Sequence, residues 1–346
     1  MKRMLLLFLV LLLAAGCARA PAGTPEAVPT TKPAGPAAEP AVTQEANMNT
    51  PAIQIVRTIE LPFIPHDIAV AADGSIYAVE LGAPRVHKLD SDGKVLVSWG
   101  EAGTQAGQFA FDPPPDAPPL DGGFIVAGSN GNVYVTDSYN NRVQVFDSEG
   151  GFVEMWESFG QKSTRLQVFD SEGGIVEMWD GFRQENSRFN NPGPISIDAR
   201  GNIYVADFQG GHVFDADGNY LETIRTAGEL AFDSLGNMFT VIAFEGTALK
   251  VPAGGGEPSI LGTAGSEAGQ FTTPMWVEVG PDDTVYISDH SGRVQLFDAD
   301  GNLLTVWTGP LDGGSPLAGP SPLSQDSEGN IYVATKDRKT VYVIKL

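Results

Sequence analysis

The sequence predicts an all-β fold, a six-bladed β-propeller of four-stranded antiparallel blades, and three repeated patterns lead to this prediction. A phrase of turn residues followed by alternating β-branched and aromatic residues occurs six times within residues 51–346. A second phrase, two short strands around an Asp-Gly or Glu-Gly turn, follows most copies of the first. A short apolar run precedes each first phrase. One period is therefore four strands, a to d, in about 45 residues, the repeat length of a propeller blade.

The first phrase predicts strand b of each blade, because turn residues stand ahead of a two-residue alternation. Its copies are DGSIYAVE from Asp73, NGNVYVTD from Asn130, RGNIYVAD from Arg200, LGNMFTVI from Leu235, DDTVYISD from Asp282 and EGNIYVAT from Glu328. The apolar runs before these copies, such as HDIAVAA, PISIDA and MWVEVG, predict strand a, the innermost strand.

The second phrase predicts strands c and d as a hairpin. It is RVHKLDSDGKVLVSWG from Arg85, RVQVFDSEGGFVEMW from Arg142, HVFDADGNYLETI from His212, LKVPAGGGEPSIL from Leu249 and RVQLFDADGNLLTVW from Arg293. The acidic turns lack the spacing of a helix-loop-helix calcium loop, which needs Gly at position six and Glu at position twelve. We therefore expect them to be turn residues that tolerate positive φ.

The chain ends after strand c of the sixth unit, TVYVIKL, and has a spare strand, IQIVRTIEL, at the start of the repeat region. We expect residues 53–60 to supply strand d of the last blade, because this pairing closes the ring and leaves no open edge.

One half-blade occurs twice. RVQVFDSEGGFVEMW begins at Arg142 and RLQVFDSEGGIVEMW begins at Arg165, and the two stretches differ at two positions. Since blade 2 has four strands without the second copy, the sequence predicts an extra hairpin at blade 2, at about residues 160–182.

The N-terminal region predicts export and a lipid anchor. Residues 1–16 combine two basic residues with an apolar run too short to span a bilayer, which is typical of a signal peptide. The end of this run, LLAAGC, resembles the lipobox of bacterial lipoproteins, which implies that Cys17 carries the lipid. Residues 17–50 are rich in Pro, Ala and Thr and predict a disordered tether for the propeller at 51–346. We expect a location outside the cytoplasm, attached to the bacterial cell envelope through the lipid only.

The net negative charge of the chain limits the kinds of molecule that it can bind. The net charge of −22 repels nucleic acid and anionic lipid, so we expect a protein or small-molecule partner and no nucleic acid. Cys17 is the only cysteine, so no disulfide can form within the chain. We expect a monomer.

The combination of P-x-x-I-A-V, G-N-x-Y-V-x-D, R-V-Q-V-F and a following Trp resembles the NHL-repeat family of six-bladed propellers. The resemblance covers nearly all of residues 51–346, and blade 4 departs most. The PHDIAV stretch also resembles peptidyl-hydroxyglycine amidating lyases, which hold zinc with histidines from three Pro-His pairs around the axis. Only Pro65-His66 matches here, while the other blades have NPGPIS, TPMWVE and SPLSQD. Because catalytic zinc usually needs three protein ligands, we expect no metal site and no other cofactor.

In a four-stranded meander, the starts of the a strands and the b–c turns share one face. On this face the candidate ligand-binding residues are His66, Asp67, Tyr139, Asn141, Phe208, Trp276 and His290. His87 and His212 fall on c strands, where we expect structural roles. Three acidic residues that end b strands precede basic residues that open c strands, and we expect three structural pairs: Glu80 with Arg85, Asp137 with Arg142, and Asp289 with Arg293.

No nucleophile elbow, phosphate loop or Cys/His cluster stands out in the sequence, and we assign no catalytic residue. We therefore favour a surface-tethered, non-catalytic binding propeller that captures a protein or small ligand on its loop-rich face. The alternative is a metal-assisted lyase or lactone hydrolase with a site at the mouth of the central channel.

Overall fold

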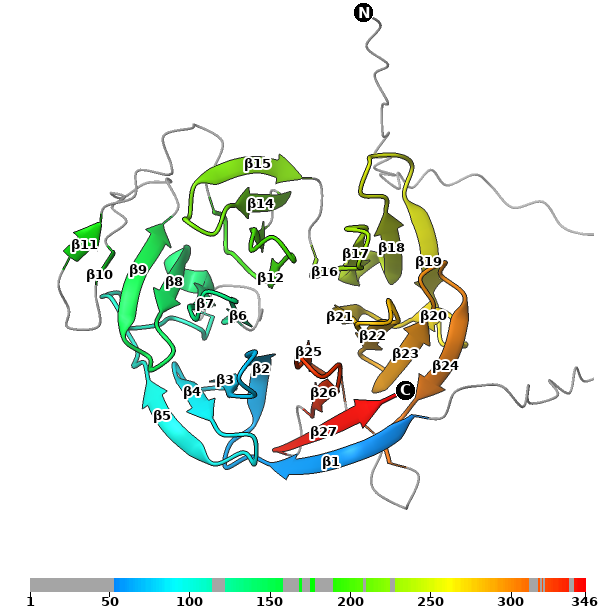
Figure 1. Cartoon of the computed structure of the whole chain (residues 1–346), viewed down its shortest axis with the longest axis horizontal. Helices are drawn as coiled ribbons and strands as arrows, with labels where there is room; N and C mark the ends of the chain where they lie inside the picture. The colour runs from blue at the N-terminus through cyan, green and yellow to red at the C-terminus, as the bar shows by residue number, and fades with distance from the viewer. Residues whose placement is uncertain are drawn as a thin grey trace, which may run out of the picture. The chain divides into compact units, whose positions relative to one another are not determined.

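Six β-sheets stand around a central axis like the blades of a propeller (Figure 1). The computed structural model describes residues 53–346 except 114–121, 158–167, 170–174, 178–188, 208–209, 225–227, 311–316, 318, 320 and 336–338. The predicted signal peptide at 1–16 and the tether at 17–50, with Cys17, fall outside the described residues, as does Phe208. Where residues are described, no helix is long and apolar enough to cross a membrane.

The blades follow the predicted order, with strand a nearest the axis. Blade 1 contains β2 (Pro65–Val70), β3 (Ile76–Glu80), β4 (Val86–Leu89) and β5 (Val95–Trp99). Blade 2 contains β6 (Ile125–Ala127), β7 (Val133–Asp137), β8 (Arg142–Phe146) and β9 (Phe152–Glu157). Blade 3 contains β12 (Ile195–Ile197), β13 (Ile203–Asp207), β14 (Gly210–Phe214) and β15 (Tyr220–Ile224).

Blade 4 has five strands: β16 (Leu230–Phe232), β17 (Met238–Ile242), β18 (Thr247–Val251), β19 (Ser259–Ala264) and β20 (Gln270–Phe271). Blade 5 contains β21 (Pro274–Val279), β22 (Val285–Asp289), β23 (Arg293–Phe297) and β24 (Leu303–Trp307). The helical segments of the described chain are the single turns η1 (Ser138–Asn140) and η2 (Ala243–Glu245), at the b–c turns of blades 2 and 4. The fold is all-β, as the repeats predict.

Blade 6 joins the two ends of the repeat region. It contains β25 (Leu323–Gln325), β26 (Ile331–Ala334), β27 (Thr340–Lys345) and β1 (Gln54–Glu60). β1 pairs antiparallel with β27, with Thr58 opposite Tyr342, and Ile59 is buried against the blade. The prediction that the N-terminal strand completes the last blade is confirmed.

The Asp-Gly turns are held by their own carboxylates. In the c–d turn of blade 1, Asp90 Oδ1 accepts hydrogen bonds from the backbone N–H groups of Asp92 and Lys94, at 3.0 and 2.9 Å. Gly93 has φ of 84°, which a side chain would strain. Asp90 therefore holds the backbone of its own turn.

The described part of the duplicated stretch forms a hairpin at blade 2. β10 (Val168–Phe169) and β11 (Ile175–Glu177) pair antiparallel in a separate two-stranded sheet. β10 lies next to β9, at the outer rim of the blade (Figure 1). The remainder of residues 160–182 lies outside the described residues.

Candidate functional site

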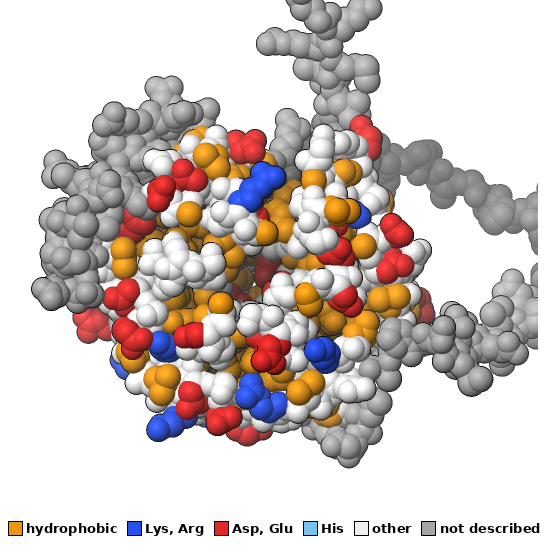
Figure 2. Space-filling model, in the orientation of Figure 1, with side chains coloured by type: hydrophobic (Ala, Val, Ile, Leu, Met, Phe, Trp, Pro, Cys, Tyr) orange, Lys and Arg blue, Asp and Glu red, His pale blue; other side chains and the backbone are white. Residues whose placement is uncertain are grey.

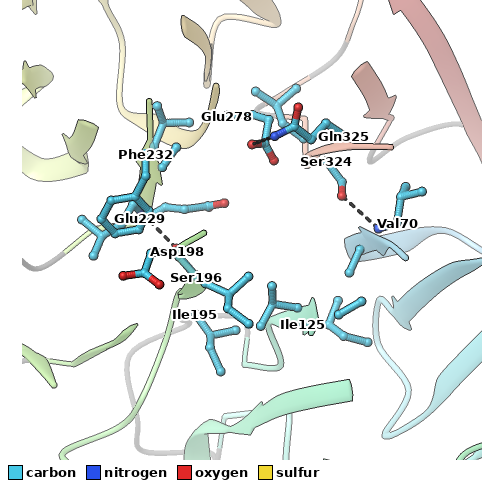
Figure 3. A pocket seen from close by; sticks show the side chains of 18 of the residues that line it. Val70, Ile125, Ile195, Ser196, Asp198, Glu229, Phe232, Glu278, Ser324 and Gln325 are labelled. Atoms are coloured by element: carbon cyan, nitrogen blue, oxygen red, sulfur yellow. Dashed lines mark hydrogen bonds between the residues drawn. The ribbon is translucent and has the colours of Figure 1, made fainter. Parts of the chain in front are cut away.

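A cavity of about 340 Å³ lies on the propeller axis. All six innermost strands, β2, β6, β12, β16, β21 and β25, contribute to its wall (Figure 3). In the space-filling view one face is hollowed at its centre, and acidic side chains are visible inside (Figure 2). The size is in the range of small-molecule sites.

Hydrogen bonds between neighbouring blades hold this wall. The backbone N–H of Val70 donates to Ser324 Oγ at 2.9 Å, which joins blades 1 and 6. Leu230 N–H donates to Ser196 Oγ at 3.2 Å, which joins blades 4 and 3. Polar side chains of the a strands therefore fix the innermost strands in place, and the cavity is preformed.

The two ends of the cavity differ. We call the end at the starts of the a strands the closed end, and the end at the a–b turns the open end. In β12, β16 and β25 the first residue is buried and the last is half-buried. The cavity wall continues into the a–b turns at Asp198, Ala199 and Asp233. Exposure thus increases along these three strands toward the a–b turns.

Aromatic side chains fill the closed end. The His66 ring lies edge-on to Phe124 and Trp276, with centroids at 5.1 and 6.5 Å. Trp276 is 0% exposed, and its indole N–H donates to Asp67 Oδ1 at 3.1 Å. Asp67 Oδ2 accepts from the backbone N–H of Ile125 at 2.9 Å. These contacts join blades 1, 2 and 5 across the axis.

Some carboxylates of the cavity wall bind backbone N–H groups, and others face the cavity. Asp198 and Asp233 each accept backbone N–H bonds in their own a–b turns, so these two groups are structural. Glu229, directly before β16, and Glu278 of β21 project toward the cavity (Figure 3). Among the described residues of the wall there is no lysine, arginine or histidine. The cavity therefore disfavours anions.

Glu278 is the residue of the cavity best suited to proton transfer. Burial raises the pKa of Glu278 to about 7, against the opposing hydrogen bond from the Val279 backbone N–H. Glu278 Oε1 accepts that bond at 3.0 Å and a longer one from Gln325 Nε2 at 3.4 Å. Both protonation states of Glu278 are therefore populated near neutral pH, as acid–base catalysis requires.

The structure brings together three of the predicted ligand-binding residues. His66, Asp67 and Trp276 meet at the closed end, and all three are buried. Tyr139 is half-buried on η1, and Asn141 and His290 are exposed at the b–c turns of blades 2 and 5. Phe208 lies outside the described residues. A ligand-binding role for this set stays a prediction.

The sequence did not single out Glu229 or Glu278. Glu229 directly precedes a short apolar a strand, and the MWVEVG run around Glu278 predicts only a buried strand. The one available signal was a glutamate at an alternate position of such a strand, since a charge there needs a partner or a cavity.

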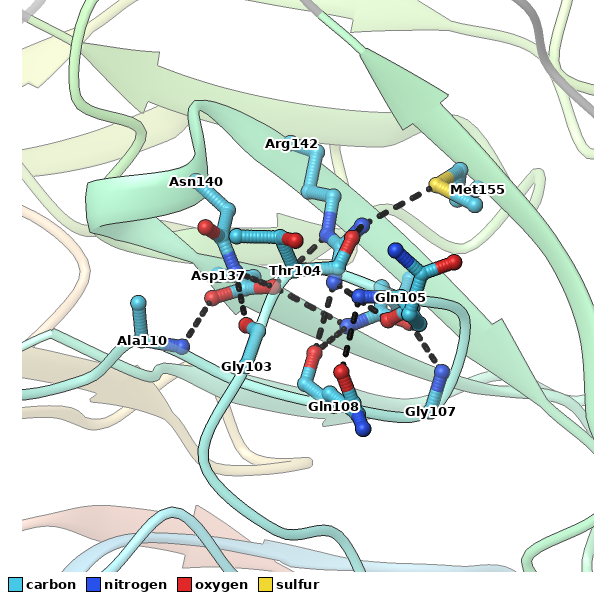
Figure 4. A network of polar contacts seen from close by, with 11 residues as sticks. Gly103, Thr104, Gln105, Gly107, Gln108, Ala110, Asp137, Asn140, Arg142 and Met155 are labelled. Carbon is cyan, nitrogen blue, oxygen red and sulfur yellow. Dashed lines mark hydrogen bonds and ion pairs between the residues drawn. The ribbon is translucent and has the colours of Figure 1, made fainter.

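The predicted acidic–basic pairs are structural. Arg142 Nε donates to Asp137 Oδ2 at 2.7 Å, within a network that also binds the chain at Gly103–Gln108 (Figure 4). Arg293 and Asp289 pair at 2.9 Å. The prediction for Glu80 was wrong about its partner, because the Glu80 carboxylate contacts His87 Nε2 at 3.0 Å instead of Arg85.

The buried histidines of the c strands are held in place. His87 stacks on Phe63 at 4.0 Å and contacts Ser98, and burial lowers its pKa. His212 lies 3.1 Å from Asp207. Both histidines have the structural surroundings that the sequence predicts.

The residues do not fit the zinc site of the amidating lyases. The His66 ring packs against Phe124 and Trp276, and no histidine lines the cavity within the described chain. The described residues contain no group of three or more His, Cys, Asp or Glu side chains placed to hold a metal ion.

Comparisons with known proteins agree with the repeats. Residues 123–146 match the NHL repeat. A probable peptidyl-α-hydroxyglycine α-amidating lyase of Caenorhabditis elegans is 28% identical over 94 residues, which are 26% of this chain and 25% of that protein. The chain thus matches a quarter of the length of this relative.

Solved structures share the fold. A streptogramin B lyase superposes with a TM-score of 0.54 at 14% identity, over 85% of this chain and 98% of that chain. A gluconolactonase from Xanthomonas campestris superposes with a TM-score of 0.52 at 14% identity, over 83% and 88%. The propellers that this chain resembles include enzymes, and the prediction of a non-catalytic binder is not supported. The chain is a six-bladed β-propeller, and residues 123–146 in its second blade match the NHL repeat.

Proposed function

We propose that this propeller is an enzyme that acts on a small neutral or cationic molecule in its axial cavity, by lyase or lactone-hydrolase chemistry. The observation that carries the proposal is the position of Glu278, a carboxyl group with a pKa of about 7 that faces a preformed cavity. The enzyme names of the propellers with the same fold support it. Those names indicate a reaction class, and fold alone does not fix a substrate.

Glu278 has one role in either reaction. Its ionised form accepts a proton, either from the substrate carbon in an elimination or from a water molecule that attacks a lactone carbonyl. Its protonated form then returns the proton to the leaving oxygen. We derive no metal-assisted step, because the described side chains do not supply a donor set for one.

The test uses the full-length chain with a panel of neutral γ- and δ-lactones and of neutral or cationic esters that can eliminate. Acid release and alkene absorbance report the two reactions. Glu278→Gln keeps the shape of the side chain but cannot take up a proton, so turnover should fall by a factor of about 10² to 10⁴. The control is Glu245→Gln, at an exposed position of η2. Unchanged turnover by Glu278→Gln would remove Glu278 from the mechanism.

We also propose that Cys17 anchors the protein to the cell envelope by a lipid. The support is the LLAAGC sequence and the Pro- and Ala-rich stretch after it. The Cys17→Ser chain should be found in the soluble fraction of cells, and pelleting with membranes would contradict the anchor.

A further inference from the structure

The sequence predicts ligand binding on the loop-rich face, at the closed end of the cavity. The structure favours the opposite end. We infer that small molecules enter the axial cavity through the open end, beside the a–b turns of blades 3 and 4, and that Trp276 keeps the closed end shut. This inference rests on the cavity of the proposed function, but its test needs no turnover.

Trp276 closes one end because it bridges blades that are not neighbours. Its ring starts from blade 5, and its indole N–H reaches Asp67 in blade 1, with blade 6 between them. The ring is fully buried and has Phe124 and His66 against its sides. Moving it aside would leave a buried Asp67 oxygen without this donor, which is costly.

The open end has the properties of a mouth. Its rim includes Asp198 and Asp233, whose carboxylates bind backbone N–H groups and so keep the turns in one shape. Ala199, next to Asp198 in the chain, also lines the cavity and is exposed and small. Phe232 is half-buried at the end of β16, with its ring 4.7 Å from Tyr204. A rigid rim with a small residue leaves room for a ligand.

Glu278 lies close to this open end, so the rate at which a reagent modifies Glu278 measures access through it. It is the last residue but one of β21, and that strand runs from the closed end toward the open end. Its side chain contacts Gln325 of β25, whose Nε2 lies 3.4 Å from Glu278 Oε1. A reagent that enters at the a–b turns therefore meets Glu278 before it reaches Asp67.

The experiment measures the rate at which a water-soluble carbodiimide, with glycinamide as the amine, modifies Glu278 in the full-length chain. The carboxyl group becomes an amide, and the carbodiimide takes up the elements of water and becomes its urea. Peptide mass spectrometry gives the rate at this residue. Glu278→Gln identifies the peptide that should not react.

Three variants place a tryptophan at different positions. Ala199→Trp should slow the modification of Glu278 by an order of magnitude, because a side chain across the mouth leaves no gap for the reagent. Ala216→Trp, on the c–d turn of blade 3, lies on the same face but outside the cavity wall, and should have no effect. Thr272→Trp, exposed just before β21, lies on the other face and should also have no effect.

The inference is overturned if Thr272→Trp slows the reaction while Ala199→Trp does not, or if Glu278 does not react in the parent. Circular dichroism checks that each variant is folded, and Ala199→Phe replaces Ala199→Trp if that variant is not. Loss of turnover in the lactone panel concerns the proposed function alone, because the modification rate depends only on access.

Discussion

The two faces of the propeller are built from different interactions. At the b–c turns, side chains reach across to neighbouring blades: Arg142 donates to the backbone carbonyls of Thr104, Gln105 and Gln108 between blades 1 and 2. At the a–b turns, carboxylates such as Asp198 and Asp326 bind mainly N–H groups of their own turn. The first face holds the blades together, and the second leaves the axis accessible.

The hydrogen-bond networks at the b–c face differ from blade to blade. Blades 2 and 5 have matching networks, since Gln144 and Gln295 each bind the backbone of the preceding linker as their arginines do. Blade 4 has the same turn, but its described residues include no arginine or glutamine that binds the preceding linker in this way. Asn141 and Gly246 both end a single helical turn in the left-handed region. Phe244 of that turn is 91% exposed. The turn geometry therefore does not depend on the network, and what the network adds is a tie between blades.

The largest effect is expected for Arg142→Ala, which removes the contacts between blades 1 and 2 at the b–c face. Arg142 is 2% exposed, and burial raises the pKa of its partner Asp137 although Arg142 opposes that rise. Without the guanidinium a buried carboxylate and several carbonyls lose their donor, so we expect a loss of about 3 to 5 kcal/mol in the free energy of unfolding. Urea denaturation measures it.

The matched control is Arg200→Ala, at an exposed a–b turn, for which we expect a change within about 0.5 kcal/mol. Equal losses for the two arginines would mean that the two faces contribute alike, and the distinction between them would fail.

The second prediction concerns the open end and pH. Burial raises the pKa of Glu278 from 4.5 to about 7, so the folded state binds the proton more tightly than the unfolded state. This contribution to stability is complete below about pH 4.5 and is lost as the pH rises to about 7, a change of about 1 to 3 kcal/mol. The difference between parent and Glu278→Gln, followed by denaturation across this range, isolates it. A difference that does not vary with pH would show that Glu278 ionises normally.

The sequence could predict the blades because each turn and alternation is local. The GNxYV phrases and Asp-Gly turns fix strand b and the c–d hairpin within a few residues, and the spare strand at 53–60 has only one open edge to join. The cavity could not be predicted in the same way. Which a-strand residues face one another across the axis depends on all six blades at once, so Glu229 and Glu278 read as strand residues only.

The third prediction tests the closed end. Trp276→Phe keeps an aromatic ring but removes the N–H that binds Asp67 Oδ1. We expect a loss of about 2 kcal/mol in unfolding free energy, because a buried acceptor is left with one donor fewer. The control, Trp307→Phe, changes a buried ring of strand d in the same blade. If both changes cost the same, only ring volume matters, and the bond to Asp67 does not hold the closed end.

The last prediction, with the smallest expected change in stability, concerns the extra hairpin β10–β11 at the outer edge of blade 2. Blade 2 is complete with β6 to β9, and β10 and β11 form a sheet of their own beside it. The inner side of β9 is held without them, because Trp156 lies 5.7 Å from Tyr134 and 4.9 Å from Phe214 of blade 3. Deleting residues 157–179 joins Trp156 to Asp180 and restores the register RVQVFDSEGGFVEMWDGF.

We expect the deletion to leave a folded six-bladed propeller whose unfolding free energy changes by only about 1 to 2 kcal/mol, since β10 and β11, which are described, belong to none of the six blades. Urea denaturation and the near-ultraviolet circular dichroism of the buried tryptophans measure this. A deletion variant that does not fold would mean that the second copy has become part of blade 2. Stability would then depend on the rim as much as on the ties at the b–c face, and the contrast between the two faces would no longer describe how the ring is held.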